Sequence, residues 1–563
     1  MTARTLIAAL LMPLAFAMAQ TARETPPDQK AYAEASRTAD PAKKIAALEK
    51  FKLDFPKSNY AQMADNSILS ALLKDMPDQK ARIRKTAAAI YKAAALRDKE
   101  ASRGGVMVTT RNRESAALRI AEQFLSANVF LKDAEGWAKR SIEPMRENVW
   151  MSEQRESLAK RKQPIPAQGE LIKRFNEQRA TRQGVLGQIE WKLGREAEAK
   201  KLLETAYAAS QSNVAVAAAL GEIARKDGDD AKALDYLIPV RLSGHAPASA
   251  SEAFESIYRK LHGGSLDGVE AMLDREYRKR LPNPVHVEAY KPDGKRSDRV
   301  VLGEVFTGSG CPPCAGADLA FDAAMERFAH KDFAVVMYHQ HIPRPDPMTT
   351  PETTARAKFY EVRGVPTFAV DGADTIGGGS REMAKGIYDR LITDVEKDLD
   401  SPAEAHVRLD AALTGAGVHA SVVVDGVKGD AKDVRVQILL VEKEIRFNGE
   451  NGIRFHPMVV RAFGGGSADG FKLDGAGGSF EASFDLDAVS KAIKQHLDEY
   501  EAKGHRGESF KFAEKKYQID RKDLAVVAFV QDAKTRHILQ AAWADLAPAA
   551  AHPTTEANTG SLR

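Results

Sequence analysis

The spacing of hydrophobic residues changes along the chain and divides it into a helical half and a strand-rich half. Between about residues 29 and 281, apolar residues recur every three or four positions, as Ile45, Leu48 and Phe51 do. The same region is rich in Ala, Leu, Glu, Lys and Arg, which favour helices. After residue 299, apolar residues form short runs or alternate with polar ones. The pattern predicts helices first and strands afterwards.

Small residues repeat within the helical half. Four pairs lie 34 positions apart: Gly187 and Gly221, Gly194 and Gly228, Ala197 and Ala231, and Ala199 and Ala233. A 34-residue period resembles tetratricopeptide repeats, in which small residues let antiparallel helices approach closely. The resemblance implies a possible protein partner on the repeats. An irregular helical array without a peptide-binding groove is the alternative.

The residues with reactive chemistry are Cys311 and Cys314. A buried strand is predicted at 300–306, followed by a short loop, the Cys-Pro-Pro-Cys motif, and a helix with apolar residues at 321, 325 and 328. A second strand is predicted at 333–338. Further on, Val365-Pro366-Thr367 enters a third strand.

A strand that runs through a CxxC motif into a helix, with a later Val-Pro-Thr segment, resembles the thioredoxin superfamily. The resemblance covers about residues 285–400 and implies an α/β thioredoxin-like domain. It also implies that Pro366 is a cis-proline that faces the dithiol and shapes contact with the substrate backbone. The activity that it implies is thiol–disulfide exchange with protein substrates, with no cofactor.

The position of Cys311 favours redox chemistry. A cysteine at the N-terminal end of a helix is stabilised as the thiolate, which is the attacking species. Cys314, one turn further on, would resolve the mixed disulfide. Pro312 and Pro313 suit a first helical turn but remove two amide donors, so we expect a modest lowering of the thiol pKa. A purely structural disulfide is the alternative, although so short a loop gives little stabilisation.

Two positions depart from the thioredoxin pattern. The buried acid that often lies six residues before the first cysteine is replaced by Val305, and the usual aromatic residue before that cysteine is Gly310. Glu304 is adjacent, but strand alternation directs it to the opposite face. Proton transfer and substrate contact are therefore expected to differ, and the direction of electron flow stays open.

Two histidines follow the second predicted strand. His339 and His341 begin a proline-rich loop at the carboxyl end of that strand, where sites form in α/β proteins. Two histidines and two thiolates are suitable ligands for copper or zinc. A histidine pair that only stabilises the loop is the expected arrangement, and a metal-handling dithiol protein is the alternative.

The C-terminal third predicts a β-sandwich. Polar and apolar residues alternate around Val407 and Val436, a continuous apolar run spans 525–530, and Asn-Gly and Asp-Gly pairs mark turns. A helix is predicted at 487–500. The predicted domains are a signal peptide at 1–19, a tetratricopeptide-like region at 20–282, a thioredoxin-like domain at 283–400, a β-sandwich at 401–548 and a disordered tail at 549–563.

The first residues predict export. The apolar run from Leu6 to Phe16 follows Arg4, is too short to span a bilayer, and precedes Ala17-Met18-Ala19, a typical cleavage signature. We expect export to the periplasm without stable membrane insertion. With 82 Lys and Arg against 78 Asp and Glu, a net charge of +4, the chain gives no argument for nucleic-acid binding.

The cysteine count limits the chemistry. Only 2 cysteines are present, which excludes a disulfide-rich scaffold and a four-cysteine zinc site. The sequence therefore predicts an exported thiol–disulfide oxidoreductase. A non-catalytic interaction scaffold with a thioredoxin-like docking domain is the main alternative.

Overall fold

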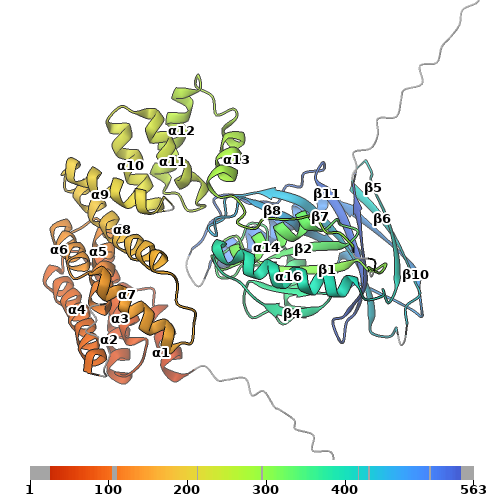
Figure 1. Ribbon diagram of the computed structural model, residues 1–563, viewed down its shortest axis with the longest axis horizontal. Coiled ribbons are helices and arrows are strands. Elements are labelled where there is room, and N and C mark those ends of the chain that lie inside the picture. The colour runs from red at the N-terminus through yellow and green to blue at the C-terminus, as the bar shows by residue number, and fades with distance from the viewer. Residues whose placement is uncertain are drawn as a thin grey trace, which may run out of the picture. The chain divides into compact units, whose positions relative to one another are not determined.

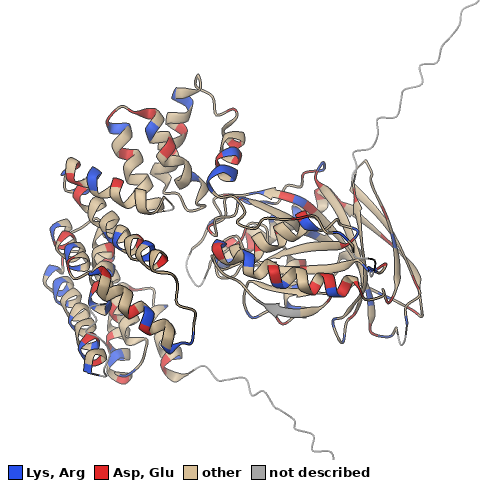
Figure 2. Cartoon of the chain, in the orientation of Figure 1, with Lys and Arg blue, Asp and Glu red and all other residues tan. Residues whose placement is uncertain are grey.

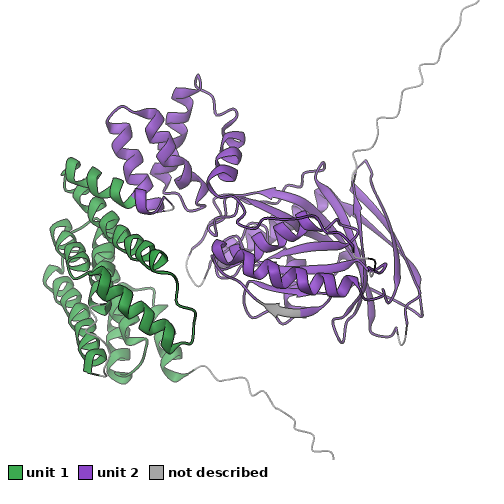
Figure 3. Ribbon diagram, in the orientation of Figure 1, with its two compact units in different colours: residues 1–206 green, residues 207–563 purple. Residues whose placement is uncertain are grey.

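The computed structural model describes residues 26–103, 111–211, 213–292, 294, 296–415, 417–428, 431–505 and 509–546. The predicted signal peptide and C-terminal tail lie outside these residues. Within them the chain is helical first and strand-rich afterwards, as predicted (Figure 1). It divides into two compact units, residues 1–206 and 207–563 (Figure 3).

The first unit is a series of helices, most of which pack on the helix before them. Asp40 caps one helix by accepting a hydrogen bond from the Lys43 amide at 2.7 Å, and Pro41 takes the first helical position after it. Its helices are α1 (Pro27–Ser36), α2 (Pro41–Asp54), α3 (Ala61–Asp75), α4 (Lys80–Arg103), α5 (Arg111–Ala127), α6 (Leu131–Ile142), α7 (Glu147–Lys160), α8 (Gln168–Lys192) and α9 (Glu196–Ala209), the last of which continues into the second unit.

The second unit begins with four helices, α10 (Val214–Lys226), α11 (Asp230–Leu242), α12 (Ala248–Leu261) and α13 (Val269–Arg280). The 34-residue repeat in the sequence recurs in the packing of these helices. A Cβ atom on Gly187 of α8 would lie 2.8 Å from Leu203, and one on Gly221 of α10 would lie 2.8 Å from Leu237. Glycine therefore lets each helix approach the next at equivalent positions, and the predicted helical repeats are confirmed.

A mixed sheet forms the centre of the second unit, in the order β12-β11-β7-β8-β2-β1-β3-β4, with β9 also paired to β7. Strand β1 is parallel to β2 and antiparallel to β3, and β2 is parallel to β8. The strands are β1 (Val301–Thr307), β2 (Phe333–His339), β3 (Thr367–Val370), β4 (Ala373–Ile376), β7 (Val434–Arg446), β8 (Phe455–Phe463), β9 (Phe471–Lys472), β11 (Leu524–Asp532) and β12 (Ile538–Asp545).

The C-terminal strands are not laid out as predicted. Instead of forming a separate body over 401–548, β7, β8, β9, β11 and β12 belong to the sheet that contains β1 and β2. The physical reason is the free edge of β2, whose backbone groups need a partner, which β8 supplies. A second sheet, β10-β6-β5, contributes to a core shared with the large sheet, in which Val422 packs with Ile438 and Val526; its strands are β5 (His406–Leu413), β6 (Gly417–Asp425) and β10 (Gly478–Asp485).

Helices cover both faces of β1 and β2. On one face α14 (Cys314–Arg327) and α16 (Ala384–Leu399) share a core with Val305. On the other, α15 (Pro351–Phe359) lies over a core that contains Phe306 and Phe529. The remaining helices are the short η1 (Arg381–Met383) and η2 (Gly464–Gly466) and the long α17 (Leu486–Lys503), close to the helix predicted at 487–500.

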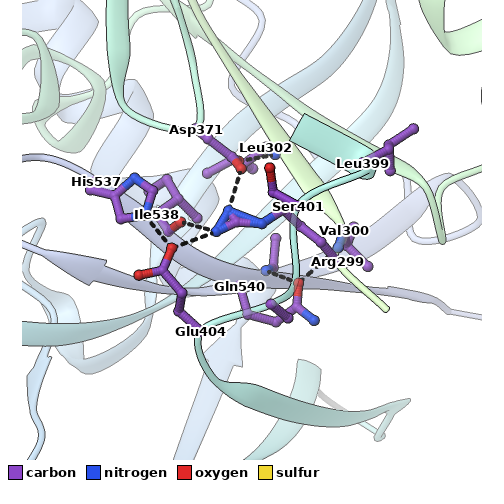
Figure 4. Close-up of polar contacts among 12 residues, drawn as sticks. Arg299, Val300, Leu302, Asp371, Leu399, Ser401, Glu404, His537, Ile538 and Gln540 are labelled. Carbon is purple, nitrogen blue, oxygen red and sulfur yellow. Dashed lines mark hydrogen bonds and ion pairs between the residues drawn. The ribbon is translucent and has the colours of Figure 1, made fainter. Parts of the chain in front are cut away.

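A buried arginine joins the start of β1 to the C-terminal strands (Figure 4). The Arg299 guanidinium donates to Asp371 at 3.1 Å and to Glu404 at 2.9 Å, and Glu404 is also 2.6 Å from the His537 ring. The Val300 amide donates to Gln540 of β12 at 2.8 Å. This network ties the predicted redox module and the C-terminal strands into one unit.

The described helices do not include one long and apolar enough to cross a bilayer. Lys and Arg alternate with Asp and Glu along the helices of both units (Figure 2). Each unit therefore presents charges of both signs.

Candidate functional site

The two cysteines lie at the carboxyl end of β1, at the start of α14. They form a disulfide with a Cα–Cα distance of 5.3 Å. The helix begins at Cys314 and Pro313 is its N-cap, so both prolines precede the first helical turn instead of forming part of it. Cys314 donates its amide to the Cys311 carbonyl at 3.0 Å, which closes the tight turn between them.

The loop around Pro366 faces the disulfide. The Val365–Pro366 peptide bond is cis, the conformation that the thioredoxin resemblance implies. The Val365 carbonyl oxygen lies 3.6 Å from the Cys311 sulfur. The structure thus brings Cys311, Cys314 and Pro366 together, as predicted, while their catalytic roles stay predictions.

A glycine-rich loop packs against the same helix end. A Cβ atom on Gly378 would lie 2.4 Å from the Pro366 ring and 2.6 Å from the Pro313 carbonyl, so only glycine fits there. The Gly316 amide, in the first turn of α14, donates to the Gly379 carbonyl at 2.9 Å. The two prolines have no amide N–H and the Gly316 amide is already bonded, so few amides at this helix start are left to face the Cys311 sulfur.

Both cysteines are buried in the disulfide form. Cys311 is 1% exposed and Cys314 0% exposed, whereas the prolines between them face solvent. Arg344 lies against Gly310, the residue before Cys311. A Cβ atom on Gly310 would be 2.9 Å from the Arg344 Cβ. The Arg344 guanidinium forms an ion pair with Glu450, and their side chains are 60% and 33% exposed. Since exposed ion pairs contribute little stability, this rim can open at low cost.

A buried carboxyl lies one helical turn after Cys314. Asp318 accepts a hydrogen bond from the Thr307 hydroxyl at 2.7 Å, and the Asn451 amide nitrogen is 3.4 Å from its other oxygen. Burial raises the pKa of Asp318 to about 7, although the Thr307 hydrogen bond opposes the shift. Asp318 is therefore a titratable group on the dithiol face of β1. The sequence does not indicate this role, because Asp318 lies on the helix after the dithiol and its partner Thr307 lies on the strand before it.

The pKa of a second buried aspartate, Asp346, is shifted downwards, in the opposite direction from that of Asp318. Asp346 accepts hydrogen bonds from the Ser309 amide at 2.6 Å and the Met348 amide at 2.8 Å, and lies 2.9 Å from the His339 ring. Burial alone would raise the pKa of Asp346, but His339 and these amides hold it well below its usual range. Asp346 thereby fixes the loop that precedes Cys311.

His341 has a separate environment from His339. Its ring accepts the Asp346 amide at 3.0 Å and packs 3.8 Å from the Tyr500 ring of α17. Burial lowers the pKa of His341 to about 4, so the ring is neutral at pH 7. Within the described ranges no group of three or more His, Cys, Asp or Glu side chains is placed to hold a metal ion. Both histidines contact Asp346 and so stabilise the loop, which is the arrangement expected from the sequence.

The turn at 449–452 is the part of the site that the sequence did not indicate. The Asn451 amide donates to the Ser309 carbonyl at 2.9 Å, and its side chain reaches the Gly308 carbonyl at 3.4 Å. The Asn-Gly pair predicted only a turn, and no local signal shows that this turn would reach residues more than a hundred positions earlier.

No protein-family model matches the chain, and no curated protein matches it.

Proposed function

We propose that the protein is an exported, periplasmic thiol–disulfide oxidoreductase that acts on polypeptide disulfides through Cys311 and Cys314. The observation that carries the proposal is the disulfide at the start of α14, with the cis Val365–Pro366 bond against the Cys311 sulfur. In this proposal the region around β1, β2, β3, α14 and α16 is a thioredoxin-like fold, and the C-terminal sheets form a sandwich attached to it.

The chemistry is thiol–disulfide exchange. The Cys311 thiolate attacks one sulfur of a substrate disulfide; a Cys311–substrate disulfide forms, and the other substrate sulfur leaves as a thiolate that takes up a proton. Cys314 then loses its proton and attacks the Cys311 sulfur, which restores the internal disulfide and releases the second substrate thiol. Two electrons pass from the dithiol to the substrate, and the reverse sequence oxidises a substrate dithiol.

The test is insulin reduction by the dithiothreitol-reduced protein. Cys311→Ser is expected to lower the rate to that of dithiothreitol alone, because the attacking sulfur is gone. Cys314→Ser is the matched variant: it retains the attacking thiol and should accumulate a covalent adduct with the insulin chain. Equal rates for wild type and Cys311→Ser would refute the proposal. The reduction potential of the pair then decides direction, since 30 mV corresponds to about 1.4 kcal/mol.

The burial of both sulfurs favours a second candidate, a non-catalytic scaffold with a structural disulfide. In that case the helical repeats bind a protein partner and the cysteines only hold the turn. Partner binding that survives replacement of both cysteines by serine, together with an inactive wild type in the insulin assay, would support the scaffold.

A further inference from the structure

The second unit contains a cavity of about 770 Å³, and one of its walls is the turn that contacts the loop before Cys311. Its walls come from the end of α9 and the residues after it, from the start of α10, from α11 and the residues after it, from the end of α13, and from the turn at 450–452. Apolar side chains contribute much of the surface, namely Tyr207, Val214, Pro239, Leu242 and Leu281. All of these residues belong to the second compact unit.

One turn is both a wall of the cavity and a rim of the dithiol site. Glu450, Asn451 and Gly452 line the cavity. The Asn451 amide also holds the Ser309 carbonyl at 2.9 Å, and Glu450 pairs with Arg344, which lies against Gly310. The turn therefore links the wall of the cavity to the loop that precedes Cys311.

The cavity walls are fixed to one another. The Gly452 carbonyl accepts hydrogen bonds from Tyr277 of α13 at 3.3 Å and from Arg381 at 3.1 Å. Arg454, buried at 1% exposure, donates to Asp274 of α13 at 2.7 Å. The cavity is thus preformed, and a ligand does not have to order its walls before it binds.

Two of the charged side chains in the cavity wall are paired within the protein, and Lys279 also lines it. Arg280 is paired with Asp235 and with Glu276, the latter at 2.7 Å, and Glu450 is paired with Arg344. Because Arg280 and Glu450 are paired in this way, the groups left to contact a ligand are the apolar side chains, Lys279 and the polar groups of the turn. An extended polypeptide with a bulky apolar side chain has this chemistry.

We propose that this cavity binds the polypeptide segment that flanks the substrate disulfide and holds it while Cys311 attacks. The inference rests on the proposed oxidoreductase function and adds a docking site for its substrate. A small disulfide reacts at Cys311 without filling the cavity, whereas a polypeptide uses both. The two classes of substrate therefore separate docking from chemistry.

The experiment uses the full-length Cys314→Ser protein and two probes, insulin and 5,5′-dithiobis(2-nitrobenzoate). Val214→Trp and the exposed position Gln211→Trp each place an indole in the cavity. We expect either variant to slow formation of the insulin adduct at least tenfold and to change the rate with the small disulfide less than twofold. Gln211→Trp guards against misfolding, because its side chain is exposed.

The control fills a different cavity. Ser70→Trp places the same side chain in a cavity of about 1100 Å³ in the first unit. If Ser70→Trp slows the insulin reaction while the second-unit variants do not, or if all variants match the parent, the docking proposal is wrong. If the Cys314→Ser parent reacts with neither probe, the oxidoreductase function itself is wrong, which is a separate outcome.

Discussion

The two faces of β1 carry buried carboxyl groups with different surroundings. On the dithiol face, Asp318 has one hydroxyl donor, Thr307, and a long contact to Asn451. On the opposite face, Glu304 receives the Arg356 guanidinium at 2.8 and 3.1 Å. Asp318 therefore has few hydrogen-bond donors to offset its burial, whereas Glu304 is paired with the positive charge of Arg356.

The network around Glu304 extends across the sheet. Both of its oxygens also accept tyrosine hydroxyls, that of Tyr338 at 2.9 Å and that of Tyr360, while Arg356 also donates to Gln531 of β11 at 2.8 Å. Burial opposes the charge of Arg356, but Glu304 raises the pKa of its guanidinium above the ordinary value. A buried network with its partners satisfied fixes structure, whereas a carboxyl with few donors changes its charge near neutral pH.

The largest expected effect on stability concerns the face of β1 on which Glu304 is paired with Arg356. Arg356→Ala leaves Glu304 buried without its counter-charge, so we expect a loss of about 3–5 kcal/mol in the free energy of unfolding. Urea unfolding measures it. Lys358→Ala, an exposed position on the same helix, is the matched control and should cost less than about 0.5 kcal/mol. A small loss for Arg356→Ala would mean that the network does not fix this face.

The contrast between the faces was only partly predictable from sequence. Strand alternation places Glu304 on the face opposite the dithiol, and the structure confirms it, because a period of two is a local property of the chain. The strand and the helix after Cys314 are likewise local, whereas the cis bond before Pro366 was expected only from the thioredoxin resemblance. Asp318 acquires its environment only when α14 packs on Thr307.

Long-range pairing explains the remaining differences. The pairing of β8 with β2 joins Val459 to Met337, and nothing near either residue indicates the other. The same is true of Asn451, whose partners Ser309 and Asp318 lie in distant segments. Alternation predicts which residues form strands, but not which sheet each strand joins.

The second expected effect is a dependence of stability on pH that comes from Asp318. Its folded pKa of about 7 lies above the ordinary value of 3.8, so its contribution to stability is complete below pH 3.8 and is lost as the pH rises to 7. Asp318→Asn removes this dependence. Relative to wild type, the variant should gain up to about 4 kcal/mol in unfolding free energy between pH 4 and pH 8.

Urea unfolding of the two disulfide-bonded proteins at several pH values gives this difference directly. Asp389→Asn on α16 is the matched control, because its carboxyl is exposed. A difference between wild type and Asp318→Asn that stays constant from pH 4 to pH 8 would contradict the assignment. The Asp318 carboxyl would then not titrate between pH 4 and pH 8.

The smallest effect concerns the rim of the dithiol face. Arg344→Ala removes an exposed ion pair with Glu450, so the unfolding free energy should fall by less than about 1 kcal/mol. Because Arg344 lies against Gly310, its truncation should expose the buried disulfide more often and speed its reduction by dithiothreitol several-fold. Glu450→Gln, which removes the charge but leaves Arg344 in place, should give a smaller acceleration. If neither variant changes the reduction rate, the rim does not limit access, and the dithiol face is closed by its core packing in the same way as the face that holds Glu304.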